Sequence, residues 1–211
     1  MENEDVMCDG EIELSDRAKS LWGKTNRVDD TEWLPLYVHM ADSAAMAARI
    51  WDTWVPYGTK SIISRDLGND DDLARKLMIF LAGVHDIGKA TPVFQAKPIS
   101  FGPDAESLVW KPEQAGLPMI AGLKDTSHPT HPIAGQVILE RYFSLVHKWG
   151  GRESRQYACV VGGHHGTPPD KSKLESARLG KTESGLDSEV WKTTQNELIE
   201  FIAGTVGMGD E

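Results

Sequence analysis

The chain has 211 residues, of which 40% are hydrophobic and 26% are charged, and its formal net charge is −10. This size and balance predict one soluble globular domain, and the acidic charge argues against a large non-specific nucleic-acid surface, although bound metal ions would add positive charge that this count omits. With two cysteines, no signal-peptide pattern and no apolar run long enough to cross a membrane, we expect a cytoplasmic protein without a disulfide framework.

The N-terminal part of the chain predicts an acidic arm followed by helices. We expect residues 1–12 to form a flexible arm and residues 13–211 to form the domain. A short helix is predicted from Ser15 to Trp22, with Ser15 as its N-cap. The first long helix covers about residues 35–54, where apolar residues recur at spacings of three and four, and Pro56 ends it.

The middle of the chain predicts a second long helix that carries a His-Asp dipeptide at its end. This helix begins near the acidic residues 70–72, which suit the positive end of a helix dipole, and stops near Gly88. A short helix follows, capped by Thr91 and with proline at its first position. Residues 97–127 are rich in proline, glycine and small polar residues, and we expect a long loop there.

The C-terminal part predicts three further helices, at about residues 131–149, 154–162 and 188–206. The segment 167–186 is polar and is expected to be mobile. No segment shows the alternation of polar and apolar residues that is typical of a strand. The predicted fold class is therefore all-α, a helical bundle.

Histidines gather at the predicted helix ends. His85 is followed directly by Asp86, and His164 is followed by His165, with glycines beside both pairs. Neutral imidazole and carboxylate are ligands for transition metals, a carboxylate can bridge two ions, and glycines such as Gly88 allow a close approach of the backbone. A single histidine such as His39 on an apolar helix is more often a half-buried residue than a ligand, so only the joint pattern indicates a metal site.

Three segments carry a resemblance to a known family. They are LPLYVHMADSAAMAA (34–48), AGVHDIGKATPVFQ (82–95) and VVGGHHGTPP (160–169). Their order resembles the HD superfamily of metal-dependent phosphohydrolases and, more narrowly, the HD nuclease domain of the CRISPR-associated nuclease-helicase of type I interference. The resemblance implies an HD-domain helical bundle that binds two divalent transition-metal ions (Mn, Fe, Co or Ni) and degrades single-stranded DNA.

The resemblance also implies roles for individual residues. One metal would be bound by His39, His85 and Asp86, with Asp86 as a bridge. The second would be bound by His131, His164 and His165, where His131 is preferred to His128 because it opens a predicted helix. Asp42 would orient a ligand imidazole by a hydrogen bond to the ring nitrogen that does not bind the metal. Lys89 would stabilise phosphate charge, or would equally be a cation that suits a helix C-terminus.

Several assignments stay open at this point. The role of His128 is open, and His147 is interpreted as a surface or helix-end residue. The last motif of the family, an aspartate on a further helix, has no match, because Asp187 and Asp210 both lie in polar stretches. We therefore expect the chain to lack the family's final helix and its helicase portion. We also expect His39, His85 and Asp86 to bind their metal ion with lowered affinity, so binding of one ion only is an alternative.

The main hypothesis is a nuclease of single-stranded DNA whose partners are a helicase domain and a CRISPR surveillance complex. Two other functions are alternatives to it. The first is an HD-type phosphohydrolase of small nucleotides, which the acidic charge favours slightly and the His-His pair disfavours. The second is a catalytically weak fragment that acts as an interaction domain. No membrane association is expected for any of the three.

Overall fold

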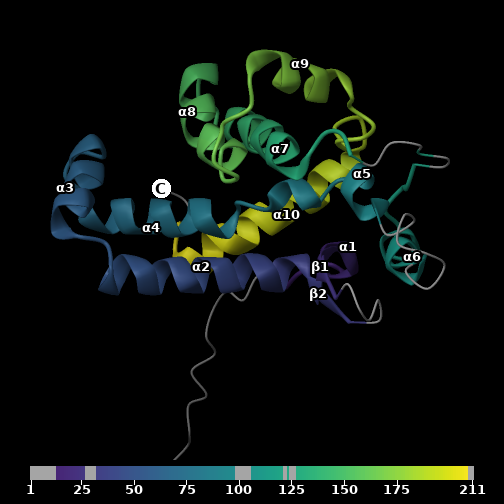
Figure 1. The fold of residues 1–211 in the computed structure, drawn as a ribbon, viewed down its shortest axis with the longest axis horizontal. Helices are drawn as coiled ribbons and strands as arrows, with labels where there is room; N and C mark the ends of the chain where they lie inside the picture. The colour runs from purple at the N-terminus through teal and green to yellow at the C-terminus, as the bar shows by residue number, and fades with distance from the viewer. Residues whose placement is uncertain (1–12, 27–31, 98–105, 121–122, 124–126, 209–211) are drawn as a thin grey trace, which may run out of the picture.

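Helices make up most of the computed structural model, which describes residues 13–26, 32–97, 106–120, 123 and 127–208 (Figure 1). The arm at residues 1–12 lies outside the described residues, so its flexibility stays a prediction. Within the part of the chain that is described, no helix has the length and apolar character required to cross a bilayer. The helical class predicted from the sequence is confirmed.

The elements follow one another closely along the chain. In order they are α1 (Asp16–Ser20), β1 (Trp22–Thr25), β2 (Trp33–Pro35), α2 (Leu36–Thr53), α3 (Tyr57–Asp66), α4 (Asp71–Gly83), the 3₁₀ helix η1 (Ile87–Lys89), α5 (Pro92–Gln95), α6 (Glu106–Gln114), α7 (His131–Leu145), α8 (Gly151–Gly162), α9 (Lys171–Leu179) and α10 (Glu189–Val206).

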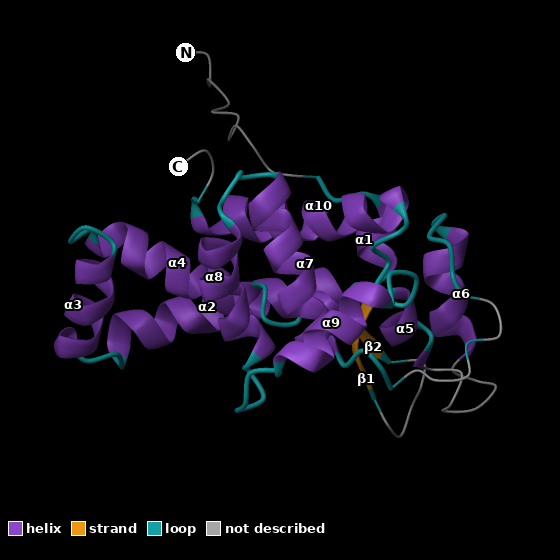
Figure 2. Ribbon diagram, turned by 90° about the horizontal axis from the view of Figure 1, so that it is seen from above, coloured by secondary structure: helices purple, strands orange, loops and turns teal. Residues whose placement is uncertain are grey.

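The helices form two layers that meet at η1. In one layer α2 and α4 pack side by side, α3 connects their ends, and α10 packs against both (Figures 1 and 2). In the other layer α7 packs against α8 and α9, and α7 also contacts η1. The core between the layers centres on α10, where Trp191, Leu198, Ile199 and Ile202 are fully buried. This packing holds the end of α4 against the start of α7.

Capping side chains explain where several helices begin. The Ser15 hydroxyl accepts a hydrogen bond from the backbone N–H of Ala18, and the Thr91 hydroxyl accepts one from the N–H of Phe94. Both caps were expected from the sequence. Each satisfies one of the backbone donors that a helix start leaves without a partner inside the helix.

The structure corrects the expected elements in five places. A short antiparallel sheet pairs β1 with β2, so the expected absence of strands is wrong; its strands are too short and too irregular to show alternation. The helix α3 follows Pro56 directly. Helix α6 lies inside the segment expected to be a loop, and α9 inside the segment expected to be mobile. Helix α4 ends at Gly83, earlier than Gly88.

Weak sequence signals explain the missed helices. Helix α6 contains Pro112, a residue that normally interrupts a helix. Helix α9 is largely polar and buries only Leu174 and Ala177, too few residues to display a helical period. Both helices pack against neighbours, α6 against α1 and α5 and α9 against α7, and such packing supplies most of the stability of a helix in a protein.

Candidate metal centre

The His-Asp dipeptide lies in the turn between α4 and η1, where the backbone leaves the helix. Val84 is the C-cap of α4, and Ile87 begins η1. Adjacent residues on a regular helix point in different directions, whereas this turn brings Nε2 of His85 to 3.2 Å from Oδ2 of Asp86 while Oδ1 of Asp86 lies 3.2 Å from Nε2 of His131 at the start of α7. The close approach depends on Gly88, since a Cβ atom there would lie 1.9 Å from the carbonyl oxygen of His131.

The Asp86 carboxylate is at the centre of the site and is only 4% exposed. Its Oδ2 atom lies 2.8 Å from Nε2 of His39 and 3.2 Å from Nε2 of His85. Its Oδ1 atom lies 3.2 Å from Nε2 of His131 and 3.6 Å from Nε2 of His164. The two oxygens of one carboxylate therefore face two different sets of imidazoles.

The side chains form two groups of candidate ligands. The first consists of His39, His85 and Asp86 and the second of His131, His164 and His165; in each, the possible ligand atoms all lie within 4.8 Å of one another. We call them the first and second triads. These are the groupings that the resemblance implied, so residues from α2, the α4–η1 turn, α7 and the turn after α8 meet in one place.

Backbone carbonyls fix the orientation of two of the imidazoles. Nδ1 of His85 lies 2.8 Å from the Ala82 carbonyl oxygen, and Nδ1 of His164 lies 2.6 Å from the Val161 carbonyl oxygen. Because a carbonyl only accepts, each Nδ1 carries the proton, and each Nε2 presents its lone pair to the site.

Three polar residues considered in the sequence lie elsewhere. Asp42 is exposed, and no contact described for it reaches an imidazole, so its orienting role stays a prediction. His147 is exposed beside the rings of Tyr142 and Trp149, in agreement with a position near a helix end. His128 belongs to neither triad and lines a groove next to the second one.

The electrostatics keep Asp86 ionised. Burial alone would raise the pKa of Asp86, but the imidazoles of His131, His39 and His85 and the Lys89 ammonium more than offset it, so the pKa is lowered. Burial also opposes the charged form of His85, yet the adjacent carboxylate raises the pKa of that ring. At His164 burial dominates and lowers the pKa, which favours the neutral ring that binds metals.

Two buried atoms in the site have no hydrogen-bond partner in the described structure, namely Oδ1 of Asp86 and Nε2 of His164. Leaving a buried polar group unsatisfied costs about 1–3 kcal/mol, so such atoms need an explanation. The two atoms lie 3.6 Å from each other, and both are metal-ligating atoms. The donor set therefore fits divalent metal ions, and its many nitrogens suit transition metals better than Mg²⁺, which prefers oxygen.

Lys89 connects the first triad to strand β1. The side chain is buried, and its Nζ lies 2.8 Å from Oδ2 of Asp86 and donates a 2.8 Å hydrogen bond to the carbonyl oxygen of Gly23. An ammonium held this way balances the charge of Asp86 and fixes its position. Lys89 is also the basic residue in the last turn of η1, so the two roles predicted for it both stay predictions.

The buried side chain of Gln95 holds this arrangement and was missed in the sequence. Its Oε1 accepts from the Trp22 N–H, and its Nε2 donates to the carbonyl oxygens of Trp22 (3.0 Å) and Lys89 (2.9 Å). The only available signal was a polar residue directly after the apolar residues Val93 and Phe94. Gln95 thereby ties β1 to the turn that carries Lys89.

Replacement of Gln95 by methionine should therefore loosen this turn. The variant keeps the size of the side chain but leaves buried backbone groups of Trp22 and Lys89 unsatisfied, so the free energy of unfolding should fall by about 1–3 kcal/mol. Urea unfolding of the metal-free protein measures this change. The matched control is Gln156→Met on the exposed side of α8, which should stay within about 0.5 kcal/mol of the parent. Equal stability of the two variants would contradict this role.

Comparisons with known proteins agree with the geometry. Residues 22–211 match the family model described as "Cas3, HD domain". The chain belongs to this family. It is 31% identical over 199 residues to the CRISPR-associated nuclease/helicase Cas3 of Streptococcus thermophilus, covering 87% of this chain and 20% of that protein. It is 28% identical over 200 residues to the CRISPR-associated endonuclease/helicase Cas3 of Thermus thermophilus, covering 93% and 19%.

Two solved structures share this fold. The crystal structure of a CRISPR-associated protein superposes with a TM-score of 0.79 at 30% identity, covering 92% of this chain and 20% of that one. The Thermus thermophilus Cas3 HD domain crystallised in the presence of Ni²⁺ gives a TM-score of 0.61 at 26% identity, covering 92% and 66%. The chain thus spans about one fifth of the length of the curated Cas3 relatives that it matches.

Proposed function

We propose that this HD domain is a metal-dependent nuclease that hydrolyses phosphodiester bonds of single-stranded DNA in type I CRISPR interference. The observation that carries the proposal is the Asp86 carboxylate, which turns one oxygen toward each triad. A carboxylate placed between two cation sites is the arrangement used in two-metal phosphoryl chemistry. The relatives named as nuclease/helicases support the same reaction class.

The side chains have separate tasks in this proposal. His39, His85 and Asp86 would hold one ion, and His131, His164 and His165 the other. When bound, the ions would supply Lewis acidity and an activated water, so no protein nucleophile is required. Lys89 holds Asp86 in position. Its ammonium has three N–H donors, so it could also donate a hydrogen bond to a phosphate oxygen of the substrate.

The metal and the partners are also proposed. Mn, Fe, Co or Ni suits the nitrogen-rich triads, and occupation of one site only is the alternative. Working partners would be a helicase domain and a CRISPR surveillance complex. Since the proposed substrate is DNA, the proposed location is the cytoplasm.

The test is a side-by-side assay of metal-stripped protein reloaded with Mn²⁺, Co²⁺, Ni²⁺ or Mg²⁺. Substrates are a labelled single-stranded DNA, the same sequence as a duplex, and a panel of mononucleotides. We expect cleavage of the single strand with a transition metal and little with Mg²⁺. Preference for a mononucleotide would favour the small-substrate phosphohydrolase, and less than one bound metal without cleavage would favour an interaction domain.

A further inference from the structure

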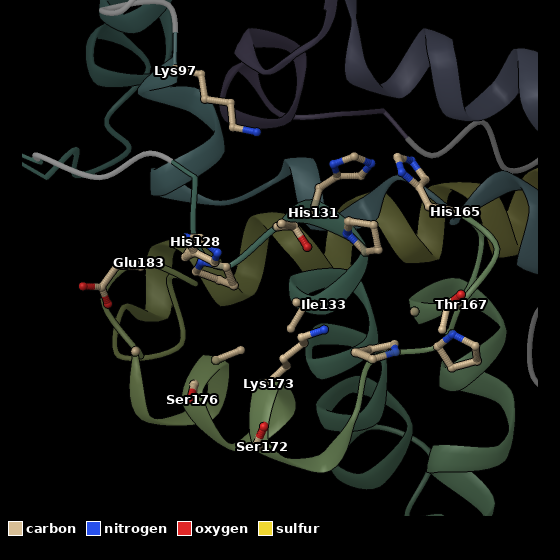
Figure 3. A pocket seen from close by; sticks show the side chains of 18 of the residues that line it. Lys97, His128, His131, Ile133, His165, Thr167, Ser172, Lys173, Ser176 and Glu183 are labelled. Atoms are coloured by element: carbon tan, nitrogen blue, oxygen red, sulfur yellow. The ribbon is translucent and has the colours of Figure 1, made fainter.

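A groove of about 1010 Å³ opens directly beside the second triad (Figure 3). It runs between the start of α7, the turn after α8 and the helix α9. Its walls include His131 and His165, which are both members of the second triad. A molecule that has a phosphate at this triad and extends toward α9 must therefore enter the groove.

The charge of the groove differs from that of the chain as a whole. The chain has a net charge of −10, whereas the described lining residues include two lysines against one acid, Glu183; Lys173 also pairs at 3.4 Å with Asp170, which does not line the groove. Figure 3 shows Lys97 and Lys173 on opposite sides of the groove with their amines turned toward the space between them, while the Glu183 carboxylate points away from it. A local positive excess of this kind attracts an anionic ligand.

Lys97 is placed close to the metal centre by an aromatic contact. Its Nζ lies 4.5 Å from the centre of the Phe94 ring, and that ring lies 5.8 Å from the ring of His131. Lys89 approaches the same phenyl ring at 5.6 Å. Burial, and then the nearby Lys89 ammonium, lower the pKa of Lys97. A bound anion stabilises the charged form of an ammonium that is desolvated and lies next to a second cation.

The remaining walls offer flat, mostly apolar faces. Pro129, Pro132, Pro168 and Pro169 line the groove together with Ile133 and the imidazole of His128. Nucleobases that are not paired with another strand stack on aromatic rings such as the His128 imidazole, and the proline rings and Ile133 add apolar contact area. Sequence-tolerant binding of single strands combines such faces with cations, so this lining suits a nucleic-acid strand better than a small anion.

We propose that this groove binds the segment of a single-stranded nucleic acid that adjoins the scissile phosphate, with Lys97 and Lys173 contacting backbone phosphates and His128 and the prolines facing the bases. The proposal rests on the proposed function, because it names the path of that substrate away from the second triad. It also assigns a role to His128, whose purpose the sequence left open.

The first test measures binding alone, so that it does not depend on catalysis. A fluorescent oligo-dT is titrated with metal-free protein at several salt concentrations, and fluorescence anisotropy gives the Kd. We expect Lys173→Ala to weaken binding about 3–10-fold and to reduce the salt slope by about one, as for the loss of one phosphate contact. Lys171→Ala is the matched control, because Lys171 lies on the same helix but not in the groove.

The second test separates the groove from the reaction. The same variants and Lys97→Ala, reloaded with metal, are assayed on the oligonucleotide and on bis(4-nitrophenyl) phosphate, a phosphodiester too small to fill a groove of about 1010 Å³. If the groove binds the strand, Lys173→Ala and Lys97→Ala should raise the KM for the oligonucleotide and leave the KM for the small phosphodiester unchanged. If Lys173→Ala and Lys97→Ala bind the oligonucleotide as tightly as the parent and Lys171→Ala do, the proposed role of the groove is wrong. If the parent hydrolyses neither substrate, the proposed function alone is wrong.

Discussion

Replacement of Asp86 by asparagine should abolish metal-dependent cleavage. The amide keeps the shape of the side chain but removes the charge that faces both triads, so both candidate ion sites lose their shared anionic ligand. Changes to residues that merely support metal ligands cost about 10–100-fold, and the loss of a bridging ligand should exceed ~10²-fold in kcat/KM. Cleavage of a labelled single strand with saturating Mn²⁺ or Ni²⁺ measures the effect.

The Asp86 result needs a control for folding and for overall charge. Asp66→Asn removes one negative charge from the exposed end of α3, and its activity should match that of the parent. Circular dichroism of the metal-free Asp86→Asn protein should retain the helical signal, because the buried core on α10 is untouched. A folded Asp86→Asn variant with full activity would refute the role of the carboxylate.

Replacement of Gly88 by alanine should damage both stability and metal binding. A Cβ atom at this position would lie 1.9 Å from the carbonyl oxygen of His131 and 2.5 Å from the backbone nitrogen of Gly135. Backbone atoms cannot move aside as a flexible side chain can, so η1 and α7 must separate. We expect a loss of about 3 kcal/mol or more in the free energy of unfolding, the upper part of the range for overpacking.

The separation would also move the His85-Asp86 turn away from His131. Metal affinity, followed by calorimetric titration with Ni²⁺, should therefore fall together with stability in Gly88→Ala. Gly58→Ala on α3 is the matched control, since a Cβ atom there meets nothing within 4 Å and should leave both quantities nearly unchanged. Unaltered stability in Gly88→Ala would show that the two elements do not touch as described.

The sequence predicted the helical class, which is confirmed, and it indicated candidate ligands in local patterns. His39, His85 with Asp86, and His164 with His165 stand at or near the ends of helices, where such a pattern is readable. The resemblance supplied what the pattern could not, namely which distant histidines meet. His131 opens α7 as expected, and the structure brings it within 3.2 Å of Asp86.

What the sequence did not predict depends on contacts between distant segments. The sheet of β1 and β2 has no readable alternation, yet the carbonyl oxygen of Gly23 in β1 accepts the hydrogen bond that fixes Lys89. Gln95 links these elements across 73 positions of sequence. A polar side chain in an apolar segment signals a buried network, but nothing local identifies its partner.

The groove also could not be predicted from the sequence, because it too depends on contacts between distant segments. Helix α9 is largely polar and buries only two residues, and it forms one wall of the groove because it packs against α7. His128 and Lys97 lie far from Lys173 in the sequence, and neither carries a motif. Their meeting beside the second triad follows from the fold, so it could be inferred only once the arrangement of helices was known.

The central claim is that Asp86 joins two cation sites, and an anomalous-scattering map of crystals grown with Ni²⁺ or Mn²⁺ tests it most directly. The account predicts two anomalous peaks, one at each triad and about 3.5–4 Å apart, with the Asp86 carboxylate between them. A map without any peak within bonding distance of Asp86, from crystals soaked to saturation, would contradict it.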